Sequence, residues 1–321
     1  MTNNIEDGIT QKTMSLLANI SASTVSRFIA SNDIAHYNTG GQRYLRYSVE
    51  DTRNIIRNLS SFPEKIIKKK HSFYNFKGGT GKTSICYQVA SHIALMGYRV
   101  LVVDADPQAH LSTSLGFSND NDHFTLYDCI TGKQDIKRVV RTIYRGLDCI
   151  PSNLSLTRLE GELNQLPKRE ERLSIELEVI ESNYDFIFID TNPTISILNR
   201  NVVTYSDIIN IVCETQPYSL NGLKLLMEDL QKFYGYMQMQ PKKINIIPNK
   251  YEDRTSSSAE AMTALRKYYH DFLKDDFAIR KSEDIVSSAK LSKPLAFFAK
   301  KNSIALEDII ELSHYIIKQS V

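Results

Sequence analysis

The chain has 321 residues and a formal net charge of only +2 at pH 7, with 42% hydrophobic and 24% charged residues. This composition is typical of a soluble globular protein with one large and one small domain, and the net charge alone does not indicate a nucleic-acid-binding protein. No apolar run approaches the roughly 18 residues of a membrane span, and no signal peptide is recognisable. The four cysteines contain no C-x-x-C pair, which argues against a zinc site or a disulfide framework and fits reduced thiols in a cytoplasm.

Charge is distributed unevenly along the chain. Residues 1–70 contain ten Lys and Arg against six Asp and Glu, and residues 241–301 contain thirteen against eight. The intervening residues 71–240 contain fifteen against twenty. The sequence therefore predicts two basic surfaces on either side of a more acidic body.

Residues 1–62 are predicted to form a small, mostly helical domain. Apolar residues in TMSLLANISASTVSRFIASNDI (13–34) are spaced as the inner faces of two short helices, with ISAS (20–23) as a turn and N-cap between them. STVSR (23–27) resembles the recognition helix of LacI-type helix-turn-helix repressors, in which the second helix enters the major groove. The candidate DNA contacts on this helix are Ser23, Thr24, Ser26 and Arg27.

A glycine hairpin is expected after the two helices. NTGGQRYLRY (38–47) carries Arg43 and Arg46, which are placed to contact DNA phosphate as a basic wing. SVEDTRNII (48–56) then begins another helix. The alternative to a winged helix-turn-helix domain is a small helical cap that only packs on the rest of the chain, because helix-turn-helix patterns have many false positives.

A linker and a larger α/β domain follow. Pro63 and the basic run KIIKKK (65–70) predict a linker over residues 63–71. Over residues 72–321, strand-like apolar runs alternate with helix-length segments, which indicates a doubly wound, mostly parallel sheet with helices on both faces. The predicted strands are 72–76, 99–104, 147–151, 184–190, 207–214 and 243–249, and the predicted helices include 82–96, 219–233 and 256–270.

The first predicted strand runs into a glycine-rich loop. FYNFKGGTGKTS (73–84) has the ending of a phosphate-binding loop of P-loop NTPases, but Phe76 stands where the usual G-x-x-x-x-G-K-[ST] pattern has its first glycine. We expect backbone N–H groups to face a phosphate, Lys82 to place a charge between the outer phosphates and Thr83 to face Mg²⁺. A glycine-rich turn that binds nothing is the alternative. The expected nucleotide-binding residues are Gly78, Gly79, Thr80, Gly81, Lys82, Thr83 and Ser84.

Three aspartates follow apolar strands. VLVVDADPQ places Asp104 and Asp106 at the end of one strand, and FIFIDTNP places Asp190 at the end of another. Ligands of open α/β sheets collect at the carboxyl ends of the strands. An acidic residue is also a common way to leave a strand, but three aspartates together with the lysine loop predict a site for a metal ion and phosphate.

KGGTGKT, DADPQ and FIFIDTNP, in this order and spacing, resemble the deviant Walker motifs of the ParA/MinD family of ATPases. The resemblance covers about residues 71–321. It includes IIPNKYEDR (246–254), which is similar to the family's segment near the adenine, and AIRKSEDIVSSAKLSKPLAFF (278–298), which is similar to its C-terminal basic segment. The resemblance implies slow, Mg²⁺-dependent hydrolysis of ATP and a homodimer that forms when ATP binds.

The same resemblance implies roles for individual residues. Lys77 would reach across a dimer interface to the phosphates of the ATP held by the partner, and Asp106 would position or activate the attacking water. Asp104 would lie by the metal, Asp190 would hold Mg²⁺ through water, and Asn249 would contact the adenine. The catalytic residues would then be Lys77, Lys82 and Asp106, and the metal site would comprise Thr83, Asp104 and Asp190.

Basic residues are scattered over residues 254–301. Scattered lysines are often just a solvated face. The resemblance implies more, because ATP-bound ParA dimers bind DNA without sequence preference through this region, and such phosphate contacts depend on salt rather than sequence. Asp284 stands where many relatives have a second arginine. The candidate contacts for nonspecific DNA binding are Arg254, Lys281, Lys290 and Lys293.

The last predicted helix, ALEDIIELSHYIIKQ (305–319), is amphipathic. Its polar face carries Glu307, Asp308 and Glu311 against Lys318. Helices that lie on membranes normally have a basic polar face, so core packing is favoured over a MinD-like membrane-targeting helix.

The leading hypothesis is an ATPase for DNA (plasmid) partition that is cytoplasmic and nucleoid-associated. A ParB-like centromere-binding protein would stimulate hydrolysis, and the N-terminal domain would bind operator DNA and repress its own operon, as in the longer plasmid partition ATPases of the ParA kind. One alternative is an ATP-regulated transcriptional repressor without a partition role. Others are a MinD-like membrane-cycling ATPase and a nitrogenase-reductase relative with a bridging iron–sulfur cluster, for which the cysteine positions are unsuited.

Overall fold

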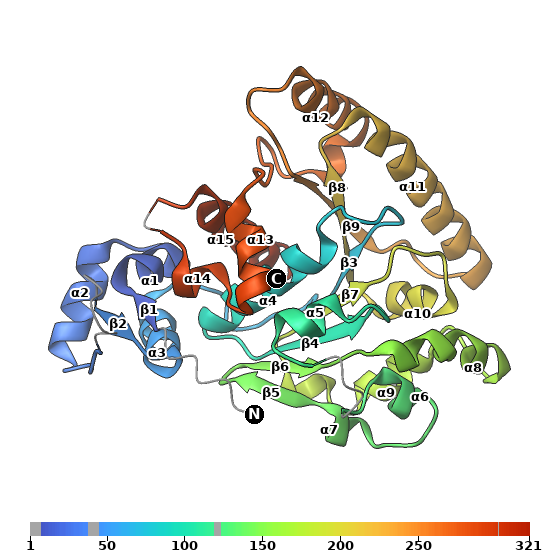
Figure 1. The fold of residues 1–321 in the computed structure, drawn as a ribbon, viewed down its shortest axis with the longest axis horizontal. Helices are drawn as coiled ribbons and strands as arrows, with labels where there is room; N and C mark the ends of the chain where they lie inside the picture. Colours follow the sequence, from blue (N-terminus) through green and yellow to red (C-terminus); the bar gives the residue numbers. More distant parts are fainter. Residues whose placement is uncertain (1–7, 38–44, 119–122, 301) are drawn as a thin grey trace.

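The computed structural model describes residues 8–37, 45–118, 123–300 and 302–321. At the centre of this described part lies a seven-stranded sheet with the strand order β5-β6-β4-β7-β3-β8-β9 (Figure 1). Neighbouring strands are parallel except at β5, which pairs antiparallel with β6 at one edge. The strands are β3 (Lys70–Tyr74), β4 (Val100–Ala105), β5 (Arg141–Tyr144), β6 (Leu147–Ile150), β7 (Phe186–Thr191), β8 (Ile208–Glu214) and β9 (Lys243–Asn249).

The predicted doubly wound, mostly parallel sheet is confirmed. Each of the six predicted strands corresponds to a strand of this sheet, with ends that differ by at most two residues. The sequence does not predict β5, because its four residues, RTIY, form no apolar run and are at most half-buried.

Helices cover both faces of the sheet (Figure 1). Short 3₁₀ segments precede α8, separate α9 from β7 and follow α12. The helices of this domain are α4 (Lys82–Leu95), α5 (His110–Ser114), α6 (Leu126–Ile130), α7 (Ile136–Val139), α8 (Leu159–Gln165), α9 (Arg172–Glu178), α10 (Ile197–Tyr205), α11 (Pro217–Met237), α12 (Ser256–Tyr269), α13 (Glu283–Leu291), α14 (Leu295–Phe298) and α15 (Ile304–Gln319).

Successive residues of the central strands enter separate hydrophobic cores. In β4, Val100 and Val102 belong to the core that includes α4 and α15, whereas Leu101 and Val103 belong to the core that includes α8, α9 and α10. Each fully buried side chain of this size contributes roughly 1.5–3 kcal/mol by leaving water. The sheet is therefore held between two apolar layers, and its chemistry is confined to the strand ends.

The last helix, α15, packs in the core as the sequence predicts. Leu306, Ile309, Ile316 and Ile317 are buried in the hydrophobic cluster that α15 shares with α4. Ser313, in the middle of this stripe, donates its hydroxyl to the Ile309 carbonyl one turn earlier. The apolar face of α15 is therefore occupied, and no helix among the described residues has the length and hydropathy to cross a membrane.

The described residues of the N-terminal part, 8–37 and 45–62, form a small unit of three helices and a two-stranded ribbon. The side chains of Thr10, Ser21 and Ser48 each accept a backbone hydrogen bond at the start of one helix, and Asn19 ends the first helix in the left-handed conformation. The elements are β1 (Ile9–Thr10), α1 (Gln11–Ala18), α2 (Ala22–Ser31), β2 (Arg46–Tyr47) and α3 (Val49–Leu59).

The N-terminal unit packs against the α/β domain. Its apolar residues, such as Met14 and Leu17, belong to the same buried cluster as Phe297 and Leu306 near the C-terminus. In Figure 1 this blue unit accordingly lies against the red helices α14 and α15. The shared core indicates that the unit is part of one packed structure and not a freely tethered module.

One buried arginine links α3 to the end of α4. The Arg53 guanidinium donates to the carbonyl oxygens of Ala94, Gly97 (3.0 Å) and Tyr98 (2.9 Å). The last carbonyls of a helix have no partner within the helix, and the negative end of its dipole favours a cation. Arg53 therefore satisfies the C-terminal end of α4 with a side chain from the N-terminal unit.

The predicted linker, residues 63–71, is also held to the body. The backbone N–H groups of Ile67 and Lys68 donate to the Ser320 carbonyl at 2.8 and 2.9 Å, and Tyr98 donates its hydroxyl to the Pro63 carbonyl. The strand β3 begins at Lys70, so the end of the predicted linker is wrong by two residues.

Replacing Arg53 tests the contact between the N-terminal unit and α4. We expect Arg53→Met to lower the free energy of unfolding by roughly 2–4 kcal/mol, because buried carbonyls lose their donor. Arg57→Met, at an exposed site on the same helix, is the matched control and should stay within about 0.5 kcal/mol of the parent. Urea unfolding measures both. Equal stabilities of the two variants would contradict the account.

Candidate nucleotide-binding site

The glycine-rich loop joins β3 to α4 at the carboxyl edge of the sheet. Gly79 and Gly81 have φ angles of 77° and 94°, in the left-handed region that favours glycine. A Cβ atom on Gly81 would lie 2.4 Å from Nδ2 of Asn249, so this glycine is also required by the close approach of β9. The loop conformation therefore depends on residues that the sequence motif supplies.

Lys82 lies inside the loop, and Lys77 lies at its mouth. The Lys82 side chain is buried, with Nζ 3.4 Å from the Lys77 carbonyl oxygen. Burial lowers the pKa of Lys82, and the charges of Asp190 and Asp106 act in the opposite direction. The buried hydroxyl of Thr80 has no hydrogen-bond partner among the described residues. The loop thus presents a cation and an unused hydroxyl to the place where a phosphate would bind.

Asp104 and Asp106 come from the end of β4, as predicted. The Asp104 carboxylate accepts from the Asp106 N–H at 3.0 Å, from the Ser112 N–H at 2.8 Å and from the Ser112 hydroxyl at 2.7 Å. Burial raises the pKa of Asp104 to about 6, although these hydrogen bonds lower it. Both carboxylate oxygens of Asp104 therefore accept hydrogen bonds that fix the turn carrying Asp106. The expectation that Asp104 lies beside a bound metal ion stays a prediction.

Asp190 lies directly beside Asp104 in the sheet. The two residues are register partners in the parallel pair of β4 and β7, and Phe73 of β3 pairs with Asp190 on its other side. Both Asp190 carboxylate oxygens are buried without a hydrogen-bond partner in the described chain. Burial and the Asp104 charge raise the pKa of Asp190 well above its usual range, whereas Thr83 and Lys82 act to lower it.

An unpartnered buried carboxylate beside a phosphate loop fits a bound cation. A carboxylate buried without a partner is costly, and a divalent cation with its waters would supply the missing partner. The described residues contain no cluster of three or more His, Cys, Asp or Glu side chains that could hold a metal by themselves. The site therefore fits Mg²⁺ held together with a phosphate group better than a metal held by protein ligands alone.

Asn249 lies at the end of β9 but contacts the loop. Its buried Nδ2 donates to the Thr80 carbonyl at 2.7 Å. The amide therefore holds the phosphate loop in place, and the predicted contact between Asn249 and adenine stays a prediction. The next residue, Lys250, donates from Nζ to the Gly79 carbonyl oxygen.

Glu214 and Lys250, two charged residues at this edge of the sheet, were not identified from the sequence. Glu214, the last residue of β8, bonds Lys77 through Oε2 at 2.6 Å and Lys250 through Oε1 at 2.7 Å. Although burial acts to raise it, hydrogen bonds from Lys250 and Lys77 lower the pKa of Glu214. The only sequence signal for Glu214 was a charged residue at the end of an apolar strand, and no motif contains it.

Comparison with known proteins identifies the family. A family model described as an AAA domain matches residues 68–244, more than half of the chain. The chromosome partitioning protein ParA of Caulobacter vibrioides is 30% identical over 230 residues, which cover 71% of this chain and 86% of that protein. The chain belongs to the ParA family of P-loop ATPases. The cell division protein PomZ of Myxococcus xanthus is 29% identical over 276 residues, 86% of each chain.

Solved structures agree with this ParA-family fold. An ATP complex of McdA from Cyanothece has a TM-score of 0.70 at 20% identity and covers 79% of this chain and 97% of its own. A plasmid partition protein of Borrelia burgdorferi bound to AMPPNP has a TM-score of 0.63 at 22% identity, with coverages of 77% and 98%. Cobyrinic acid a,c-diamide synthase of Mycobacterium smegmatis, bound to an ATP analogue and magnesium, has a TM-score of 0.68 at 19% identity, with coverages of 79% and 96%.

The predicted DNA contacts of this ParA-family chain differ in their surroundings. On α2, Ser23, Ser26 and Arg27 are exposed, whereas the hydroxyl of Thr24 is within 2.8 Å of the capping Ser21 hydroxyl. Ser26 is not free either, because it donates to Gln11 of α1. The Ser23 hydroxyl also lies 2.8 Å from that of Ser21, and contact between these residues and DNA stays a prediction.

The predicted basic wing is only partly described. Arg43 lies outside the described residues. The guanidinium of Arg46 donates to the carbonyls of Gly8 and Phe297, each at 2.7 Å. This side chain links the ribbon to the C-terminal part of the chain, and a contact between Arg46 and phosphate stays a prediction.

The predicted C-terminal basic contacts lie in two places. Exposed Arg254 and Lys281 line one groove of about 710 Å³, where Lys281 pairs with Glu252 at 2.9 Å. Lys290 is exposed in the last turn of α13, and Lys293 is half-buried just beyond its end. Arg254 and Lys281 thus share one groove, whereas Lys290 and Lys293 lie at the end of α13. The role of all four residues in DNA binding stays a prediction.

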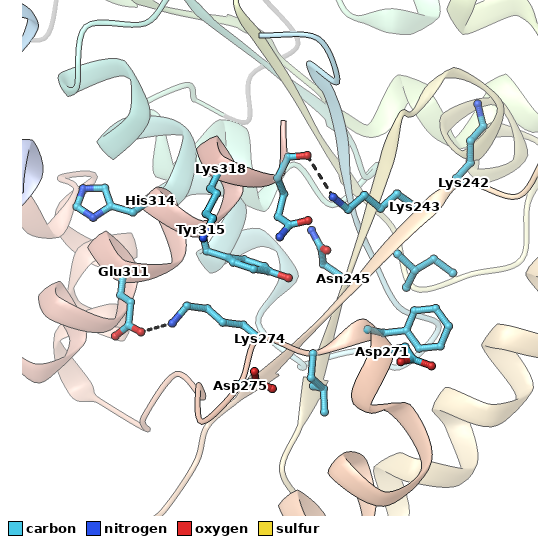
Figure 2. Close-up of a pocket in the computed structure, with 14 residues that line it drawn as sticks. Lys242, Lys243, Asn245, Asp271, Lys274, Asp275, Glu311, His314, Tyr315 and Lys318 are labelled. Atoms are coloured by element: carbon cyan, nitrogen blue, oxygen red, sulfur yellow. Dashed lines mark hydrogen bonds and ion pairs between the residues drawn. The ribbon is translucent and has the colours of Figure 1, made fainter. Parts of the chain in front are cut away.

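A further cavity of about 760 Å³ lies at the opposite end of β9 (Figure 2). Two of its lysines have partners in the cavity wall: Lys274 pairs with Glu311, and Lys243 donates to the Gln319 carbonyl at 3.3 Å. Figure 2 shows Lys242 pointing away from this group. Because β9 begins at Lys243 and ends at Asn249, the cavity is separate from the phosphate loop.

Replacing Asp190 tests whether its buried carboxylate destabilises the protein when no cation is bound. In the absence of nucleotide we expect Asp190→Asn to raise the free energy of unfolding by about 1–2 kcal/mol, since a buried charge is removed. The native pKa lies above the unfolded pKa, so ionisation costs stability as pH rises, and the gain should be larger at pH 8 than at pH 5. Chemical unfolding at both pH values measures it.

The matched control is Asp253→Asn, at an exposed carboxylate. It should change the stability by less than about 0.5 kcal/mol at either pH. An Asp190→Asn protein that is less stable than the parent, with the same pH dependence, would show that the carboxylate is already satisfied.

Proposed function

We propose that this ParA-family chain is a slow, Mg²⁺-dependent ATPase of DNA (plasmid) partition that dimerises when it binds ATP. The observation that carries the proposal is that one phosphate loop contains two lysines, one buried and one exposed. Lys82 is buried inside the loop, whereas the side chain of Lys77 at the mouth is 43% exposed. A second copy brought against this face receives Lys77 near its own phosphate site, so that ATP couples two subunits.

The aspartates supply the remaining chemistry of this proposal. Thr83, Asp104 and Asp190 would hold Mg²⁺, which would neutralise charge on the phosphates. Asp106 is fixed by its backbone bond to Asp104 and positions the attacking water. Phosphoryl transfer needs positioning and charge neutralisation more than covalent catalysis. Asp190 lies at the end of β7, Asp106 directly follows β4, and Thr83 lies in the first turn of α4.

The DNA activities of the proposal belong to two regions. In the N-terminal unit, Ser23, Thr24, Ser26, Arg27 and Arg43 contact operator DNA and so repress the chain's own operon. Arg254, Lys281, Lys290 and Lys293 contact duplex phosphates without reading sequence. A ParB-like centromere-binding protein stimulates hydrolysis and releases the nucleoid-associated dimer in the cytoplasm.

The second candidate function is an ATP-regulated transcriptional repressor without a partition role. The observation that favours it is the packing of the N-terminal unit on α4 and α15, which ties operator binding to the nucleotide-binding body. Deletion of the gene distinguishes the two functions. Loss of plasmid inheritance supports partition, whereas derepression of one operon with normal inheritance supports the repressor.

Lys77 and Lys82 are predicted to fail in different ways. Lys77→Ala should bind ATP with an affinity within about threefold of the parent but should not dimerise with it, because the cation delivered to the partner is lost. Lys82→Ala should lose ATP binding by about 100-fold or more. Fluorescent-nucleotide titration and light scattering measure the two steps, with Lys224→Ala on α11 as the control. ATP-dependent dimers of Lys77→Ala would refute the role of Lys77 across the interface.

The two DNA activities are predicted to separate in one binding grid. Operator and random duplex are each titrated with no nucleotide, ADP and ATP. We expect ATP to be required only for the random duplex, and the Lys290→Ala/Lys293→Ala pair to weaken only that binding, by about tenfold or more at moderate salt. Equal loss on both duplexes would show that the two basic regions are not separate sites.

A further inference from the structure

Lys77 has a defined partner within its own subunit. Its Nζ lies 2.6 Å from Oε2 of Glu214 and 3.3 Å from the Ser219 hydroxyl. Its backbone N–H donates to Oδ1 of Asn75 at 3.0 Å, and Nδ2 of Asn75 donates to the Val212 carbonyl at 2.7 Å. Both the backbone and the side chain of Lys77 are therefore tied to β8.

Glu214 also binds a second lysine, Lys250, which directly follows β9. Its other oxygen lies 2.7 Å from Nζ of Lys250, which also donates to the Gly79 carbonyl. The Glu214 side chain is 11% exposed, whereas those of Lys77 and Lys250 are each 43% exposed. One nearly buried carboxylate thus holds two cations at the rim of the phosphate loop.

We propose that Glu214 is a positioning residue that holds Lys77 on its own subunit, and that Lys77 must leave Glu214 before it can bind a partner's phosphates. The inference rests on the proposed function, in which Lys77 acts across the dimer. Glu214 then sets the ATP concentration at which dimers form, in competition with phosphate for the same ammonium group.

The competition follows from charge and geometry. An ammonium group at 2.6 Å from a carboxylate makes a charge-assisted hydrogen bond, and it cannot keep that bond while it reaches outward to a second molecule. The polyphosphate of ATP carries more negative charge than one carboxylate, so it can displace Glu214. Lys250 stays on the Gly79 carbonyl at the same time and keeps the loop in place.

A purely structural role makes a different prediction. If Glu214 only supports the loop through Lys250, its loss weakens the binding of every nucleotide. If it holds Lys77, its neutralisation promotes dimerisation and leaves the binding of one nucleotide to one subunit unchanged.

The test is Glu214→Gln, which keeps the shape of the side chain and removes its charge. With AMPPNP and Mg²⁺, we expect the nucleotide concentration for half-maximal dimerisation, measured by sedimentation velocity, to fall about threefold to tenfold. The affinity for fluorescent ADP should stay within about twofold, and the gain should vanish when Lys77→Ala is combined with Glu214→Gln. The matched control is Glu228→Gln, whose partner Lys224 lies on the same helix α11.

Ser219→Ala keeps the test valid if Glu214→Gln does not fold. It removes the second contact of Lys77 and should lower the half-maximal concentration in the same direction by a smaller factor. An unchanged or higher concentration in a folded Glu214→Gln protein, or an equal gain in the Lys77→Ala background, would overturn this inference. If the parent protein itself forms no dimers with AMPPNP, the proposed function has failed instead.

Discussion

The positions of the phosphate loop and of the N-terminal unit depend on one helix, α4, and on the contacts at its two ends. At its N-terminal end, Gly81 allows the chain to pass within reach of Asn249, whose amide fixes the phosphate loop. At its C-terminal end, Arg53 of the N-terminal unit donates to the carbonyl of Ala94 in the last turn and to those of Gly97 and Tyr98 just beyond it. Because unpaired backbone groups are costly at each end, α4 joins the loop to the N-terminal unit through satisfied hydrogen bonds.

The carboxyl edge of the sheet is arranged for ligands at the expense of its own stability. Asp104 and Asp190 lie side by side in register. Asp104 accepts three well-formed hydrogen bonds, whereas Asp190 has none of ordinary geometry among the described residues, and only the nearby Thr83 hydroxyl and Lys82 charge lower its pKa. Lys82 is buried beside them and supplies part of the balancing charge. Because one of the two carboxylates lacks well-formed hydrogen bonds among the described residues, binding of a cation and phosphate stabilises this edge. A nucleotide can in this way select one state of the protein.

The sequence allowed the sheet, the loop and the three aspartates to be predicted, because each is encoded within a short stretch. Apolar runs marked the strands, and the glycines and Lys82 marked the loop. The roles of Asn249 and Arg46 could not be predicted in this way, since their partners Thr80 and Phe297 lie 169 and 251 residues away. Glu214 was missed for the same reason: the register of β8 beside β3 brings it to Lys77, and no local pattern records that.

The central claim is that Lys77 completes the phosphate site of a second subunit, and mixing two inactive variants tests it most directly. Lys77→Ala subunits keep an ATP site, and Lys82→Ala subunits keep the lysine that would reach across. Each alone should hydrolyse no ATP, whereas an equal mixture should recover up to about one half of the parent ATPase rate, because neither variant dimerises alone and each hybrid dimer has one complete site of two. A mixture that stays inactive although both proteins are folded, or a Lys77→Ala protein that is active alone, would contradict the account.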